Sequence, residues 1–318
     1  MPIVYIHGVA VRDDPTPVAR ALKRLREVPW PVIRANLREH VAPVLSDDPE
    51  GVPIRRAYWG DLGARFAWGG RSLISQPVDA EALGTGVTGG VQPQGEAVPV
   101  ERVRRADAIR EAGIRRMIGA ATALRRPFED FVPIFLGDVL TYIATRGTPQ
   151  APGAIPLRIL EELETAHAAA RLRSEPLVVV THSMGGQILY DALTAFLPAR
   201  PADRGVRVDY WCAIASQIGL FEELKLFLAS DPAYSAEHGT VAPHPPAEHL
   251  GGWWNVWDHA DLLSFRAGGI FDGVDDSPFF AAGTLASDHH KYLDNPDFYR
   301  ALAARVAASL EAERSGGP

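Results

Sequence analysis

The chain has 318 residues but only one cysteine, Cys212, so it can form neither an internal disulfide nor a cysteine-based zinc site. Cys212 lies in an apolar run at 210–215, which predicts a buried, unreactive thiol. The chain also lacks an excess of basic residues. Its formal net charge is −7, whereas general nucleic-acid binders carry a strongly basic surface. We therefore expect no nucleic-acid partner.

Long hydrophobic runs are also absent. The best candidate, 131–143, is interrupted by Pro133 and Asp138, and no stretch approaches the roughly 18 apolar residues of a membrane span. The N-terminus has no cationic segment followed by a long apolar stretch, so no cleavable secretory signal is expected. These two absences predict a chain without a transmembrane segment and with a cytoplasmic location.

Short apolar runs that alternate with helical patterns are present. The runs at 3–6, 31–35 and 54–58 are typical of strands, and residues 14–27 and 155–173 have the pattern of helices. With 47% hydrophobic residues, the chain can bury one large core. Alternating strands and helices predict an α/β fold with a mostly parallel central sheet and helices on both faces.

This regularity lapses in the second quarter of the chain. Residues 76–99 are rich in Gly, Pro and Gln without periodicity, which predicts a loop. Residues 102–124 then form an amphipathic pattern with arginines on one face, which we interpret as a solvated face, with contact to anionic lipid or a partner as the alternative. We expect a single domain over 1–318, with a cap, lid or loop inserted at about 60–150.

The most informative stretch is a strand that runs directly into a helix. Residues 177–180 are Leu-Val-Val-Val, as in a strand buried on both faces, and residues 187–193 have a helical pattern. Between them stands Thr-His-Ser-Met-Gly-Gly at 181–186. A serine on so tight a corner is held out at the carboxyl edge of the sheet, and small neighbours leave room for the strained backbone. Ser183 is therefore a candidate nucleophile.

This stretch resembles the nucleophile elbow, G-x-S-x-G, of the α/β-hydrolase superfamily, and in particular its lipase- and esterase-like serine hydrolases. Thr181 stands where the first glycine of that motif is usual. The resemblance implies the α/β-hydrolase fold and a serine nucleophile at Ser183. We expect His182, beside it, to pack under the corner rather than to react.

An acyl-transfer site also needs two backbone N–H groups that point at the developing oxyanion. The resemblance assigns one to Met184, the residue after the nucleophile, and the other to a loop after an early strand. His7-Gly8 ends the first predicted strand and resembles the His-Gly oxyanion motif of lipases and esterases. By that resemblance Val9 is the second donor, with Ala10 as the alternative.

The acid and base of such a site should follow the serine in the order Asp or Glu, then His. After an apolar run at 252–257, the sequence reads Asp-His-Ala-Asp at 258–261. Similarity to a lipase-like segment favours Asp261 as the acid, and Asp258 remains the alternative. Either carboxylate could instead accept backbone N–H bonds at a strand end.

Only His289 and His290 lie beyond Asp261 in the chain. Related hydrolases carry a histidine three residues before an aromatic at this point, which favours His289 as the base and leaves His290 as the alternative. A metal site at the two histidines would need further ligands, and none occurs at a suitable spacing, so we expect neither a metal nor a cofactor.

Together these features predict a serine hydrolase that cleaves a carboxylic ester, from a small molecule or a lipid, through an acyl-enzyme at Ser183. A thioesterase or an acyltransferase would use the same three residues. A catalytically silent protein of the same fold, which binds a partner or lipid through the cationic helix, is the non-enzymatic alternative. The sequence alone indicates neither the substrate nor the oligomeric state.

Overall fold

The computed structural model describes most of the chain, including six strands of a central sheet and every candidate site residue named above. The described residues are 2–13, 28–67, 131–201, 205–280 and 288–316.

A six-stranded sheet forms the centre of the molecule, and every described pair of neighbouring strands in it is parallel. The strand of Ser183, β5, is third from one edge of the sheet. In spatial order the strands are β2 (Ile54–Ala57), β1 (Ile3–Ile6), β5 (Val178–His182), β6 (Val208–Ile214), β7 (Leu250–Trp257) and β8 (Asp275–Pro278).

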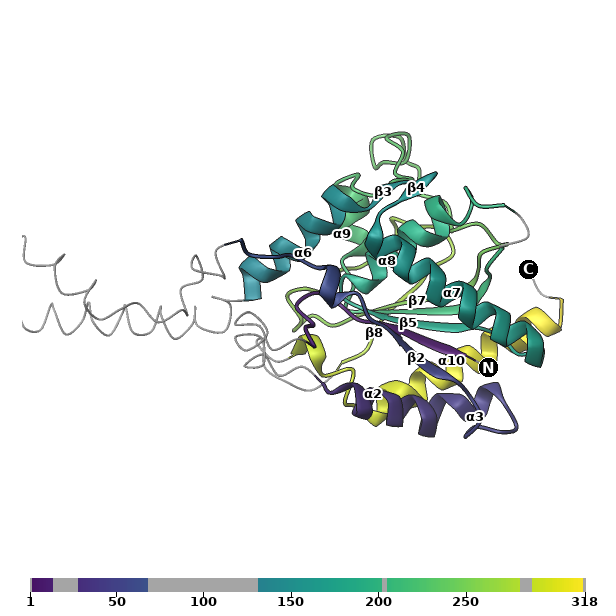
Figure 1. The fold of residues 1–318 in the computed structure, drawn as a ribbon. Helices are drawn as coiled ribbons and strands as arrows, with labels where there is room; N and C mark the ends of the chain where they lie inside the picture. Colours follow the sequence, from purple (N-terminus) through teal and green to yellow (C-terminus); the bar gives the residue numbers. More distant parts are fainter. Residues whose placement is uncertain (1, 14–27, 68–130, 202–204, 281–287, 317–318) are drawn as a thin grey trace, which may run out of the picture.

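Helices cover both faces of this sheet (Figure 1). One face carries α6 (Phe131–Thr145), α7 (Ala154–Arg173), α8 (Gly185–Asp191) with its π-helical continuation (Ala192–Phe196), and α9 (Ile218–Glu223). The other carries α2 (Trp30–Asn36), a π-helical turn (Leu37–Val41), α3 (Ala42–Leu45) and α10 (Pro296–Arg314). Shorter elements are two 3₁₀ turns (Gly60–Leu62 and Asp288–His290) and the hairpin of β3 (Gly147–Thr148) and β4 (Ala151–Pro152). The α/β architecture expected from the sequence is therefore present.

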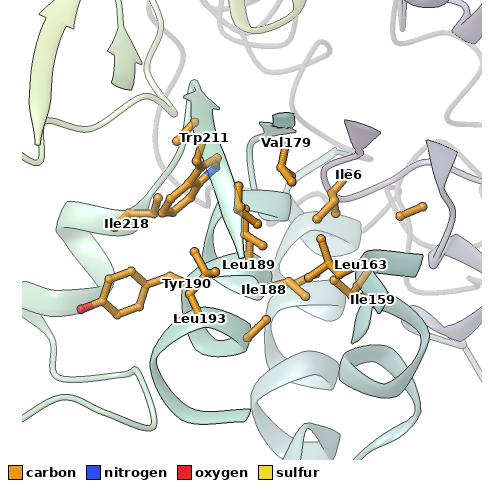
Figure 2. Close-up of a cluster of buried hydrophobic side chains, with 14 of the residues drawn as sticks. Ile6, Ile159, Leu163, Val179, Ile188, Leu189, Tyr190, Leu193, Trp211 and Ile218 are labelled. Carbon is orange, nitrogen blue, oxygen red and sulfur yellow. The ribbon is translucent and has the colours of Figure 1, made fainter. Parts of the chain in front are cut away.

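Strand alternation divides the hydrophobic core into two layers. Successive strand residues point to opposite faces, so Ile6 and Val179 pack against α7 and α8, while Tyr5 and Val180 pack against the α2–α3 segment and α10. Figure 2 shows the first layer, where Ile159 and other residues of α7 and α8 meet Ile6 and Val179. Burial of both sheet faces explains why β5 is apolar over consecutive residues.

The predicted strand at 31–35 is wrong, because these residues form the helix α2. Pro31 stands in the first turn of α2, where a missing N–H costs no hydrogen bond. The buried side chains of Ile33, Leu37 and Val41 recur every four residues and form one helical stripe. The β-branched residues at the start of this stripe suggested a strand, but its period is helical.

The predicted strands at 3–6 and 54–58 and the predicted helix at 155–173 are confirmed within one residue. Cys212 is buried, as expected, and burial raises the pKa of its thiol. The predicted helix at 14–27, the loop at 76–99 and the cationic helix at 102–124, with most of the proposed cap, lie outside the described residues. In the part of the chain that is described, no helix has both the length and the apolar character needed to cross a bilayer.

Candidate active site

Ser183 occupies a sharp corner between β5 and α8. Its φ is +52°, in the left-handed region that non-glycine residues rarely adopt. The Ser183 N–H donates to the carbonyl of Ile214 at the end of the neighbouring strand β6, and the Ser183 carbonyl accepts from Gly186. Such backbone strain persists only where the surroundings enforce it, and it is concentrated at functional sites. The corner expected from the sequence is therefore present.

Glycines allow the segments around this corner to approach one another closely. A Cβ on Gly185 would lie 2.5 Å from the carbonyl oxygen of Ile6, so α8 begins directly against the end of β1. A Cβ on Gly8 would lie 2.7 Å from the Cβ of Ser183. The loop that follows β1 therefore packs directly beside the candidate nucleophile.

Thr181 replaces the usual first glycine of the elbow without disturbing it. Its side chain is fully buried, and its Oγ1 accepts a hydrogen bond of 2.9 Å from the indole N–H of Trp211 on β6. The larger residue fits because strand alternation directs it away from the site into the core, where Trp211 satisfies the hydroxyl.

The buried carboxylate of Asp261 pairs with the partly buried ring of His289, although 28 residues separate them in the chain. Nδ1 of His289 lies 3.1 Å from Oδ1 and 3.0 Å from Oδ2 of Asp261, and Oδ1 also accepts from the N–H of Leu263. Burial alone would raise the pKa of Asp261, but the charge of His289 and these hydrogen bonds outweigh it, and the net pKa is lowered. The carboxylate therefore stays ionised, and in the neutral form of the His289 ring it favours the tautomer with the proton on Nδ1 and an acceptor at Nε2.

The two alternative residues take other roles. Asp258 accepts the N–H of Ala260 through Oδ1 at 3.0 Å, a local turn-forming contact of the kind expected for a carboxylate at a strand end. His290 packs its ring against those of His182 and His289, at 5.1 and 5.3 Å between centroids. Burial, with the charges of His182 and His289, holds the pKa of His290 well below its usual range, so this ring is neutral.

Ser183 and His289 present complementary atoms at neighbouring positions. The ring of His289 lies 4.7 Å from that of His182, the residue before Ser183. Ser183 Oγ and His289 Nε2 are both buried, and neither has a hydrogen-bond partner among the described residues. Buried polar atoms are nearly always bonded, and in ligand-free enzymes the bond between nucleophile and base is often long and tightens when substrate binds. A free hydroxyl and a free acceptor nitrogen are the groups that proton transfer requires.

The loop after β1 distinguishes the two candidate oxyanion donors. The N–H of Ala10 donates to Oδ2 of Asp138 at 2.8 Å and is thereby occupied. No hydrogen bond joins the N–H of Val9 or of Met184 to another residue in the described ranges. Val9 and Met184 therefore keep the free donors that an oxyanion hole needs, whereas Ala10 does not.

His7 holds this loop in place as a neutral structural group. Its Nε2 accepts the N–H of Trp59 at 3.0 Å, its carbonyl accepts the Trp59 indole N–H at 2.9 Å, and the two rings stack. Its Nδ1 is 2.7 Å from the carbonyl of Gly8 and must donate the proton, because Nε2 is an acceptor. Burial lowers the pKa of His7 to about 3, which keeps this arrangement neutral.

Asp138 on α6 is a supporting residue that sequence reasoning missed. Its carboxylate is fully buried and accepts the N–H groups of Ala10 and Ala64, and it pairs with the guanidinium of Arg12. Three partners on two loops make it an anchor for the segment that follows β1. The signal was visible in the sequence as a lone charge within an apolar run.

A second set of residues that sequence reasoning missed forms hydrogen bonds to the loop that carries Asp261. Gln217, just after β6, donates to the carbonyl of Leu263 and accepts from Gln187 of α8. Ser216 donates to the side-chain carbonyl of Asn255 at 2.8 Å, and the side-chain NH₂ of Asn255 donates to the carbonyl of Phe265. Nothing in the spacing of these amides and hydroxyls marks them in advance, because their partners lie far away in sequence, on α8, β7 and the loop after β7.

The residues that the structure describes contain no cluster of three or more His, Cys, Asp or Glu arranged to hold a metal ion. Comparisons of the whole chain found no matching protein-family model, no matching curated protein and no matching solved structure.

Proposed function

We propose that this protein is a serine hydrolase of the α/β-hydrolase fold that cleaves a carboxylic ester through an acyl-enzyme on Ser183. One observation carries the proposal: a serine on a strained corner directly follows His182, whose ring lies 4.7 Å from the ring of His289, and His289 is paired with the buried carboxylate of Asp261. The order Ser, Asp, His along the chain and the strand-to-helix corner are those of this fold.

The proposed reaction begins with His289 as general base. Its Nε2 takes the proton of the Ser183 hydroxyl while Oγ attacks the substrate carbonyl carbon, and Asp261 stabilises the imidazolium that forms. The tetrahedral oxyanion accepts hydrogen bonds from the N–H groups of Met184 and Val9. When the intermediate collapses, the carbon–oxygen bond to the leaving alcohol breaks, and His289 returns the proton to that oxygen.

The second half of the reaction repeats these steps with water. His289 removes a proton from water as the water oxygen attacks the acyl carbon. The bond between that carbon and Ser183 Oγ then breaks, His289 returns the proton to Oγ, and the carboxylic acid leaves. We favour carboxylic esters over amides as substrates, because an alkoxide leaves more easily than an amide nitrogen.

The proposal is tested by the rates at which the full chain hydrolyses p-nitrophenyl esters, from acetyl to palmitoyl, with S183A and H289Q as comparisons. We expect turnover of at least one chain length, reduced by about 10³-fold or more in each variant. Thioesters and a primary alcohol acceptor, added as separate arms, distinguish a thioesterase and an acyltransferase from an ester hydrolase. Equal rates in the wild type and S183A would exclude Ser183 as the nucleophile.

A further inference from the structure

His182 is the last residue of β5 and stands directly before Ser183. Strand alternation points its side chain to the face of α10, on the same side as Val178 and Val180, and the side chain is buried. There the ring meets the 3₁₀ turn that precedes α10. Its Nε2 lies 2.7 Å from the carbonyl oxygen of His289.

The partner of this nitrogen fixes the state of the ring. A carbonyl oxygen only accepts, so Nε2 of His182 must carry the hydrogen and donate it. Burial lowers the pKa of His182 to about 3, so the ring is neutral and its Nδ1 is bare. Nδ1 faces the loop after β1, since a Cβ on Gly8 would lie 3.3 Å from it. The ring of His182 is therefore oriented by the His289 carbonyl at its Nε2 edge and by close packing against Gly8 at its Nδ1 edge.

The same ring contacts both histidines of the turn. Its centroid lies 4.7 Å from that of His289 and 5.1 Å from that of His290, with interplanar angles of 50° and 43°. The backbone of His289 is thus fixed by His182, while its Nδ1 is fixed by Asp261. The first contact comes from the strand of the nucleophile, and the second comes from the loop after β7.

We propose that His182 is a positioning residue that ties the backbone of His289 to the strand of Ser183 and so sets the spacing between nucleophile and base. This inference rests on the proposed function. It gives the hydrogen bond a role beyond packing: because His182 is covalently adjacent to Ser183, a shift of His289 away from the serine has to break the bond. Proton transfer depends steeply on such spacing, and misplacement by 1 Å can cost about 100-fold in rate.

The test compares two amides at position 182. In H182Q the side-chain NH₂ reaches the place of the histidine Nε2 and can donate to the His289 carbonyl, whereas the shorter side chain of H182N cannot. We expect kcat for the best ester to fall about 10- to 100-fold in H182N with KM changed less than about twofold, and H182Q to recover most of that loss. The rate at which a fluorophosphonate labels Ser183 should follow kcat in all three proteins.

His249 supplies the matched control. It is also buried, and its Nδ1 bonds a backbone carbonyl, that of Val206, at 2.9 Å, but it lies at the amino end of β7, away from Ser183. H249Q and H249N should lower the melting temperature while kcat stays within about twofold of wild type. Comparison with these variants distinguishes the effect on kcat of losing any buried histidine from the effect of losing the contact to His289.

Equal kcat in H182Q and H182N, or in both and the wild type, would overturn the positioning role. The role would also be overturned if the fall in kcat of H182N were no larger than the fall in its folded fraction measured by circular dichroism. If H182N does not fold, the test rests on folded H182Q, which keeps the N–H donor to the His289 carbonyl. A kcat of H182Q as low as that of H289Q would then contradict the positioning role. Failure of the proposed function itself is distinguishable: S183A would then turn over esters and take up the label like wild type.

Discussion

Both carboxylate oxygens of Asp261 lie within 3.1 Å of Nδ1 of His289, whereas the carboxylate of Asp258, three residues earlier, accepts a local backbone N–H. The sequence left both aspartates open as the acid. Because only Asp261 can fix the proton of His289 on Nδ1, the two residues should differ sharply in their effect on catalysis.

We expect D261N to lower kcat by about 10⁴-fold, because an amide that donates to Nδ1 favours the wrong tautomer of the base. D258N should change kcat by less than about tenfold and mainly weaken the turn that it closes. Steady-state kinetics on the best ester measure both. A larger loss in D258N than in D261N would assign the acid to the other aspartate.

Gly8 tests the approach of the loop after β1 to the nucleophile. In G8A the new Cβ would lie 2.7 Å from the Cβ of Ser183 and 3.1 Å from the carbonyl of His182, so the loop has to move. We expect kcat to fall by about 100-fold, which is the scale of one lost oxyanion donor, with a smaller change in KM.

Gly239 is the control for that substitution. It has a φ of +64° and nothing within 4 Å of an added Cβ, so G239A should cost about 1 kcal/mol of stability through backbone strain and leave kcat unchanged. Full activity in G8A would show that the loop accommodates the added Cβ without a change at the site. It would remove the argument for the Val9 N–H as an oxyanion donor.

Acid should destabilise the fold through its buried neutral histidines. The pKa of His7 is about 3 in the folded protein and 6.5 in an unfolded chain, so between these values the unfolded state binds more protons. The free energy of unfolding should therefore fall as pH decreases from 6.5 towards 3, by at most about 1.4 kcal/mol per pH unit for each such histidine, with no further loss below 3.

Urea denaturation from pH 7 to pH 4 measures this slope. H7Q carries no titrating ring, so its slope should be shallower than that of wild type by up to the contribution of one histidine. Parallel curves for the two proteins would mean that His7 is protonated in the fold.

Thr181 tests the departure from the glycine of the usual elbow. T181V leaves the buried indole N–H of Trp211 without its acceptor, and we expect a loss of about 1–3 kcal/mol in the free energy of unfolding. T181S keeps the hydroxyl and should lose less. Both should retain kcat per folded molecule, since Thr181 points into the core; a selective loss of kcat in T181V would place it in the reaction instead.

Much of the fold could be predicted because its signals are local. The apolar runs at β1 and β5 and the serine between a strand and a helix are contiguous in sequence, and the structure has them where expected. The helix α2 was misassigned because β-branched residues and Pro31 suggested a strand over a few positions. Only the longer stripe from Ile33 to Val41 shows its helical period.

The main residues of the candidate site could be proposed from the sequence, but the residues that support them could not. Chain order and resemblance favoured Asp261 and His289, which the structure pairs. The bond from His182 to the His289 carbonyl could not be predicted, because it joins residues 107 apart through a backbone atom that has no sequence signal. Asp138 was noticed only as an interruption, since the N–H groups it accepts lie on two distant loops.

The most direct test of the account is the mass of the full chain after reaction with a fluorophosphonate, with the modified peptide identified by tandem mass spectrometry. We predict a single stoichiometric adduct on Ser183 that forms far more slowly in D261N and is absent in S183A. An unmodified protein under conditions that label a control serine hydrolase, or an adduct on another residue such as Ser216, would contradict it.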